Sequence, residues 1–243
     1  MRDISSINAR QIRIYEPDVI PFRFLRTKIA TEYLIKQFQF KEVDTEPMEV
    51  GFNAGTFALS ETNLLPINFV LINDRRIIVD VAGSSDAASR FYEDLRFLLA
   101  SMDPDRRLKE RAPLITTHET QCVSTMEFGW HDLFAEGLST FIGGPALRAV
   151  EVEGESEARL TTFSLRFGFS FSHKNLKLLD SGVTLSDKYL VIEPRGSTPL
   201  EDRRFYSVSP LPSDAHISLL GQLEQAVLGG NRGKRRKSLS AST

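Results

Sequence analysis

The chain has 243 residues, 41% of them apolar and 26% charged, and its formal net charge is −2. These proportions are typical of a globular protein with a buried core, and no apolar run is long enough for a transmembrane helix. The first residues lack the apolar block of a secretory signal, and the single cysteine, Cys122, excludes an internal disulfide framework. We therefore expect a cytoplasmic protein that does not enter a membrane.

The charge is unevenly distributed along the chain. Residues 230–243 carry five basic side chains and no acidic one, so this tail has a charge of +5 and residues 1–229 have −7. Clustered positive charge attracts phosphate groups or an acidic partner, whereas a solvated tail without a binding role is the alternative interpretation. The side chains predicted to bind are Arg232, Lys234, Arg235, Arg236 and Lys237.

In the first half, alternating polar and apolar residues predict a short strand over 11–15, and helical spacing predicts a helix over 26–38. Residues 49–59 are expected to be extended. Bulky apolar runs on either side of Asn73-Asp74 predict a hairpin over 68–81. An amphipathic helix over 86–102 follows and should end before Pro104.

The charged segment 103–113 is the predicted boundary between two halves. In the second half, residues 114–128 predict one or two strands, and Gly143-Gly144-Pro145 should end a helix over 130–142. A hairpin is expected over 147–153 and 160–172. The remaining predictions are strands over 189–192 and 204–208, a helix from 214 to about 228 ended by Gly229-Gly230, and a disordered tail.

The clearest strand pattern covers residues 163–171. Phe163, Leu165, Phe167, Phe169 and Phe171 alternate with small or polar residues, which predicts one face against a core and one face in solvent. We expect helices or a second sheet to cover the apolar face.

A short sequence similarity indicates an internal duplication. Moving the chain by 128 residues places Ser85-Asp86-Ala87 on Ser213-Asp214-Ala215 and aligns apolar positions of the helices that follow. In both places a β-rich stretch precedes the helix. The predicted fold class is therefore α+β, built from two similar units of mostly antiparallel strands with helices packed on one face. The units cover residues 1–110 and 111–229, and the tail covers 230–243.

Two His-x-Thr/Ser triplets, His118-Glu119-Thr120 and His216-Ile217-Ser218, provide the candidate catalytic groups. They resemble the signature of the two-histidine phosphoesterases. The resemblance implies two strands that present imidazole and hydroxyl together, with one histidine as base and the other as acid. His118 and Thr120 fit a strand, but His216 and Ser218 lie in a predicted helix, where residues two apart diverge by about 200°. The alternative is a structural role for both histidines.

The other candidate site residues are one cysteine and two glutamates. Cys122 has no basic neighbour in sequence and is expected to be a buried, inert thiol. Glu151 and Glu153 could hold a divalent cation, although an exposed hairpin tip explains them more simply. We expect no metal and no cofactor.

Together these patterns favour a protein that is not an enzyme. We predict a protein-interaction or assembly module whose partner is another protein or a second copy of the chain, met at sheet edges or at a patch between the halves. The first alternative is a nucleic-acid-associated protein anchored by the basic tail. The second is the phosphoesterase.

Overall fold

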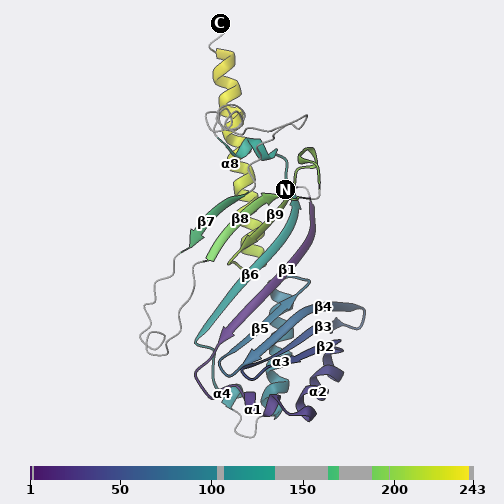
Figure 1. Ribbon diagram of the computed structural model, residues 1–243. Coiled ribbons are helices and arrows are strands. Elements are labelled where there is room, and N and C mark those ends of the chain that lie inside the picture. The colour runs from purple at the N-terminus through teal and green to yellow at the C-terminus, as the bar shows by residue number, and fades with distance from the viewer. Residues whose placement is uncertain (2, 103–106, 135–163, 170–187, 197, 241–243) are drawn as a thin grey trace, which may run out of the picture.

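A single sheet of nine antiparallel strands, in the order β2-β3-β4-β5-β1-β6-β9-β8-β7, organises the computed structural model (Figure 1). The structure describes residues 1, 3–102, 107–134, 164–169, 188–196 and 198–240, with backbone alone for 131 and 230–240. Its mixed content of helices and antiparallel strands confirms the α+β class.

The described strands are β1 (Asp3–Ile14), β2 (Glu42–Thr45), β3 (Glu49–Ser60), β4 (Asn63–Asn73), β5 (Arg76–Val81), β6 (Ile115–Thr125), β7 (Leu165–Phe169), β8 (Lys188–Pro194) and β9 (Arg204–Ser209). The described α-helices are α1 (Phe22–Leu25), α2 (Lys28–Phe38), α3 (Ser85–Met102), α4 (Arg107–Glu110) and α8 (Ser213–Ser240). Two short 3₁₀ turns are η1 (Trp130–Leu133) and η2 (Leu200–Asp202).

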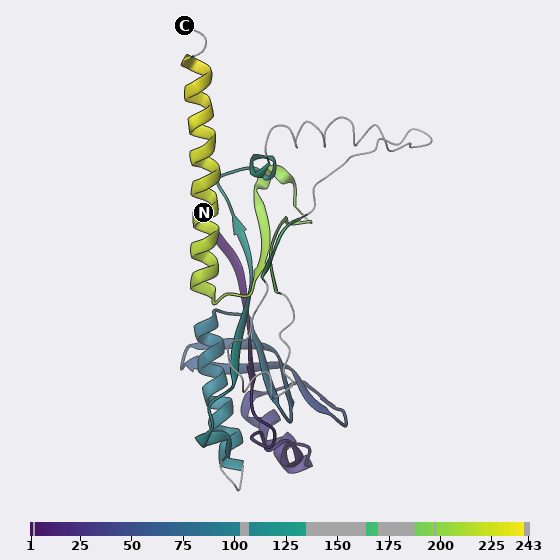
Figure 2. The same cartoon turned by 90° about the vertical axis from the view of Figure 1, so that its left-hand side faces the viewer.

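The helices α3 and α8 lie on the same side of the sheet and meet at their N-terminal ends (Figure 2). Beneath them, the buried apolar side chains form two clusters. The first lies between residues 9 and 108 and is covered by α2 and α3. The second lies between residues 122 and 220 and is covered by α8. One-sided helix packing therefore leaves the opposite face of the sheet without a described helix.

The centre of the sheet is the long pair of β1 and β6. Their register runs from Asp3 opposite Thr125 to Ile14 opposite Ile115. The strand predicted over 11–15 is thus only the end of a much longer one. Polar residues interrupt the apolar pattern of β1 and find tertiary partners: Arg10 lies 2.9 Å from the Asp80 carboxylate, and the buried Gln11 side chain donates its amide N–H to the Ser89 hydroxyl at 3.1 Å.

Ser85 and Ser213 join the two long helices at their first residues. The Ser85 N–H donates to the Ser213 hydroxyl oxygen at 2.8 Å, and the Ser213 N–H donates to the Ser85 hydroxyl oxygen at 3.0 Å. Both serines are buried. Each therefore satisfies an N-terminal amide of the other helix, and α3 also has a cap of its own, because the Ser84 hydroxyl oxygen accepts from the Ala87 N–H at 3.3 Å.

Close packing of α2 on β3 requires glycine at position 55. A Cβ atom there would lie 2.5 Å from the Phe40 ring and 2.9 Å from the Phe38 carbonyl oxygen. Both distances are too short for any heavier side chain, so the glycine allows the end of α2 to approach the sheet. This contact holds the α1–α2 segment against the first half of the sheet.

Three predicted elements differ from the structure or extend outside it. The glycine pair 229–230 does not end α8, which continues to Ser240, because glycine lowers helix stability by about 1 kcal/mol without forbidding the conformation. The helix predicted over 130–142 begins as the turn η1, and its remainder lies outside the described residues. In the phenylalanine-rich strand, β7 covers Leu165–Phe169, and Phe163 and Phe171 lie outside the described residues. Leu165 and Phe169 contact the second cluster, but Phe167 is 48% exposed.

Candidate functional site

The two histidine triplets lie in different kinds of element. His118 and Thr120 lie two residues apart on β6 and share its helix-covered face. His216 and Ser218 lie at the start of α8, where His216 is fully buried and Ser218 is exposed. Since Thr120 and His216 are both inaccessible to solvent, the structure does not assemble the four side chains around one open point.

The His216 imidazole connects α8 to β9. Its Nε2 atom lies 2.8 Å from the Ser207 hydroxyl, and its Nδ1 atom is hydrogen-bonded to the Ser209 hydroxyl. Burial lowers the pKa of His216 to about 4, because the charged imidazolium loses its hydration. The ring is therefore neutral near pH 7, when one nitrogen donates and the other accepts.

The remaining candidate residues from the sequence are partly or fully buried, or they lie outside the described residues. Burial lowers the pKa of His118, and the nearby Arg13 lowers it further. Cys122 is 1% exposed, and burial raises the pKa of its thiol to about 11, which suits an inert side chain. Glu151 and Glu153 lie outside the described residues. No group of metal-ligating side chains placed to hold an ion occurs in the described part.

The five basic tail residues, Arg232, Lys234, Arg235, Arg236 and Lys237, lie on the C-terminal part of α8. Figures 1 and 2 show this part of the helix projecting beyond the sheet. The backbone thus places the cluster on one continuous helix, although the sequence predicts a disordered segment there.

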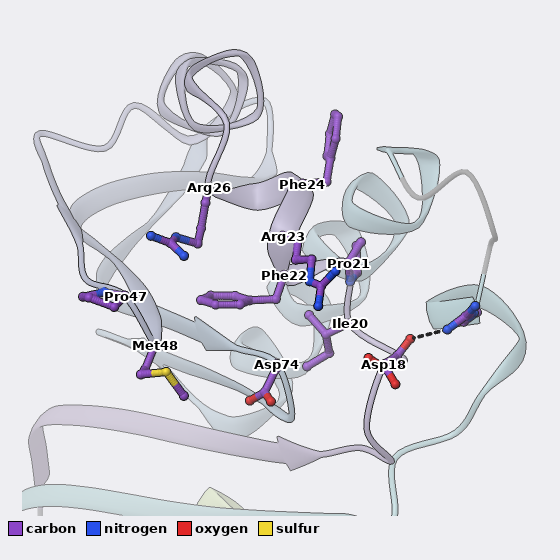
Figure 3. A pocket seen from close by; sticks show the side chains of 11 residues that line it. Asp18, Ile20, Pro21, Phe22, Arg23, Phe24, Arg26, Pro47, Met48 and Asp74 are labelled. Carbon is purple, nitrogen blue, oxygen red and sulfur yellow. Dashed lines mark hydrogen bonds between the residues drawn. The ribbon is translucent and has the colours of Figure 1, made fainter.

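A hollow of about 620 Å³, which we name the α1 pocket, opens at the end of the sheet that carries α1 (Figure 3). Its lining comes from four separate parts of the chain. These lining residues are Asp18, Ile20, Pro21, Phe22, Arg23, Phe24, Arg26, Pro47, Met48, Asp74 and Arg107.

Buried anchors position the first wall. Val19, Ile20 and Leu25 belong to the first apolar cluster, with exposed fractions of at most 5%. Because these side chains are buried, Arg23 and Phe24 on the short helix α1 face the solvent. Thr27 then begins α2 as its N-cap, where its hydroxyl oxygen accepts from the Ala30 N–H at 3.4 Å.

Tight turns supply the other walls. Pro47 and Met48 form the tip between β2 and β3, closed by a hydrogen bond of 2.9 Å from the Glu46 N–H to the Glu49 carbonyl. Proline at the second position of such a turn fits its fixed φ angle. Met48 stays 72% exposed at this tip.

The turn between β4 and β5 places Asp74 at the rim of the pocket. The Asn73 side chain accepts from the backbone N–H groups of Arg75 and Arg76, at 2.9 and 2.8 Å. This local arrangement is an Asx turn. Since the turn uses the Asn73 side chain internally, the neighbouring Asp74 carboxylate remains available to the pocket, as Figure 3 shows.

The two arginines of the α1 segment lie on different sides of the opening. Arg26 lies above Pro47 and Met48, whereas Arg23 lies on the side of Ile20 and Asp18, and Asp74 lies across the opening from Arg26 (Figure 3). Arg107 donates to the Asp18 carbonyl oxygen at 3.3 Å. No carboxylate of the described residues forms an ion pair with Arg23 or Arg26.

Sequence reasoning did not identify the α1 pocket. The one local signal is the run Pro-Phe-Arg-Phe-Leu-Arg at 21–26, which puts two arginines among bulky apolar residues after a proline. Nothing local connects this run to Met48, Asp74 or Arg107, since those residues meet it only through the sheet.

The fold and pocket together define a mixed α+β protein with a partly apolar, arginine-rich hollow. Comparison with family models, with curated proteins and with solved structures finds no match. Among the described helices, none has the length and apolar character needed to cross a membrane.

Proposed function

We propose that this protein is a non-enzymatic interaction module that contacts its partner with the end of the sheet carrying α1 and α2. One observation carries the proposal. Of eight exposed large apolar side chains among the described residues, four lie between residues 24 and 48: Phe24, Ile29, Tyr33 and Met48. Their exposed fractions range from 38% to 77%, and two of them line the α1 pocket.

The physical reason is the cost of leaving these side chains in water. Burying apolar surface is favourable by about 25 cal/mol per Å², and large apolar side chains exposed in one part of a fold suit an interaction surface. Ile29 and Tyr33 lie one helical turn apart on α2, so they present adjacent side chains. The buried side of the same helix is held by Ala30, Leu34 and Phe38, which makes the exposed side a rigid contact surface.

Site-specific photo-cross-linking tests this proposal in cells that produce the full chain. A benzophenone amino acid is placed at Tyr33, and a control carries it at Phe97, another exposed aromatic position, which is 72% exposed on α3. We expect one discrete adduct from position 33, with a mass that identifies a partner or a second copy of the chain. Adding Ile29→Lys should reduce its yield at least about tenfold, because a charge would enter the interface.

Absence of an adduct at position 33 would contradict the proposal. So would the same adduct, at the same yield, from position 97. An adduct of twice the chain mass would identify self-assembly, and any other discrete mass would identify a different protein.

We also propose that the chain arose by internal duplication. Three regularities support this. Outward from the centre of the sheet, the order β1-β5-β4-β3 on one side matches the order β6-β9-β8-β7 on the other. The strands β5 and β9 lie 128 residues apart in the chain, as do the starts of α3 and α8. The reciprocal hydrogen bonds of Ser85 and Ser213 join the two positions that this offset relates. The units 1–110 and 111–229 remain a prediction.

Nucleic-acid association through the tail is a second candidate. One observation favours it: α8 carries the basic residues 232–237 on a helix that projects beyond the sheet (Figure 2). Such a helix concentrates positive charge away from the acidic remainder of the chain.

Fluorescence anisotropy with a short DNA duplex tests this candidate. We expect binding by the full chain to weaken with salt, with a slope of log affinity against log salt concentration approaching about −4.5 if all five cations contact phosphates. The variant Arg235→Gln/Arg236→Gln should bind more weakly and reduce the slope by about 2. A slope that is unchanged in the variant would contradict a role for the tail.

A further inference from the structure

We propose that the α1 pocket binds a protein segment that presents acidic side chains beside one bulky apolar side chain. This inference rests on the proposed interaction function and names the chemistry of the partner. It follows from three properties of the pocket: two arginines without a carboxylate partner in the described structure, an apolar floor, and acidic groups that lie across the opening from Arg26 (Figure 3).

The arginines determine which charge is attracted. Arg23 and Arg26 are exposed and line the hollow together. The planar guanidinium group offers parallel N–H donors that match the two oxygens of a carboxylate. Residues 1–229 carry a net charge of −7, so two exposed arginines that line one hollow and have no carboxylate partner among the described residues form a local concentration of positive charge. Positive charge at this hollow attracts an acidic segment.

The floor of the pocket determines the apolar requirement. Phe22 extends its ring from α1 toward the Pro47–Met48 turn, and Met48 lies beside it below Arg26 (Figure 3). Phe22 is half-buried, whereas Met48 is 72% exposed. An unbranched thioether side chain adapts to differently shaped apolar groups. A hydrophobic side chain inserted at this point would therefore be covered by Phe22 and Met48 while its acidic neighbour reaches Arg26.

The acidic rim excludes a uniform polyanion. Asp18 and Asp74 lie across the opening from Arg26 (Figure 3), and like charges close together are unfavourable. A nucleic acid backbone would bring phosphates to both sides of the hollow. A peptide can place its carboxylates beside Arg26 and away from Asp18 and Asp74, so the charge pattern favours a protein partner (Figure 3).

Selection from a random peptide library displayed on phage tests the inference against the full-length protein. We expect enrichment of peptides in which Asp or Glu adjoins Phe, Leu, Met or Trp. A synthetic peptide of the most enriched sequence should bind Arg23→Glu/Arg26→Glu at least about tenfold more weakly, since hydrogen bonds to charged groups are lost. The control Arg90→Glu/Arg111→Glu makes the same change of net charge at exposed arginines outside the pocket and should bind almost normally.

Three outcomes would overturn the inference: no enrichment, enrichment of peptides without acidic residues, or equal weakening by the two double variants. Circular dichroism and thermal unfolding of each variant show whether it retains the fold. The result of the peptide selection can be distinguished from the result of the photo-cross-linking experiment that tests the proposed function. Cross-linking at position 33 without acidic-peptide binding would retain the interaction surface and reject the partner chemistry.

Discussion

Replacing Phe91 with alanine should lower the free energy of unfolding by about 3–5 kcal/mol. The Phe91 side chain is fully buried on α3, and its ring centroid lies 5.2 Å from that of Phe38 and 5.4 Å from that of Phe57. The substitution would leave a cavity where α2, α3 and β3 meet, and it would remove an edge-on contact with the Phe38 ring, which is inclined at 87°. Urea unfolding followed by circular dichroism measures the loss.

The same helix supplies the control. Phe97 is 72% exposed on α3, so Phe97→Ala should change the free energy of unfolding by no more than about 0.5 kcal/mol. Equal losses from the two substitutions would contradict the placement of Phe91 in the core between α2 and α3.

Acidification should destabilise the protein through His216. The pKa of this residue is lowered from 6.5 to about 4 by burial, so between these pH values the unfolded chain binds a proton that the folded chain does not. Stability is therefore unaffected above pH 6.5 and falls as the pH decreases toward 4, by about 3 kcal/mol in total from this residue. Urea unfolding at a series of pH values measures this slope.

The variant His216→Gln isolates the effect. Glutamine retains a donor and an acceptor for Ser207 and Ser209 but does not titrate. The variant should be less stable than the original protein at pH 7.5 and should lose less stability between pH 6.5 and 4, while His118 contributes equally to both proteins. Parallel pH profiles would show that His216 does not titrate with a lowered pKa in the folded state.

Elements with a strong local pattern could be predicted from the sequence. The hairpin of β4 and β5, the helix α3 and the start of α8 follow from apolar spacing and from turn or cap residues, and the structure confirms them. The predicted turn at Asn73-Asp74 is close to the observed one, in which the Asn73 side chain accepts from the Arg75 and Arg76 N–H groups. These signals act over a few residues, so they do not depend on the rest of the chain.

The candidate site could not be predicted in the same way. The sequence indicated His118 and His216 as candidate catalytic residues, because histidine commonly acts as an acid or a base. In the structure, both nitrogens of the buried His216 ring are hydrogen-bonded to Ser207 and Ser209. The α1 pocket contains no residue type that indicates a site by itself. Arg23 and Arg26 indicate a binding site only because they have no carboxylate partner among the described residues and because Met48 lies near Arg26 (Figure 3). Both observations depend on how the chain packs.

By itself, the sequence determined the α+β class, the position of the main hairpin and the beginnings of the two long helices, because propensity and periodicity are local properties. Only the tertiary structure decided the length of β1, whose Arg10 and Gln11 find partners on β5 and α3. It also decided the mutual capping of Ser85 and Ser213, and the assembly of the α1 pocket from four separate segments. Each of these depends on side chains that are distant in the chain and adjacent in space, and a local pattern carries no record of such contacts.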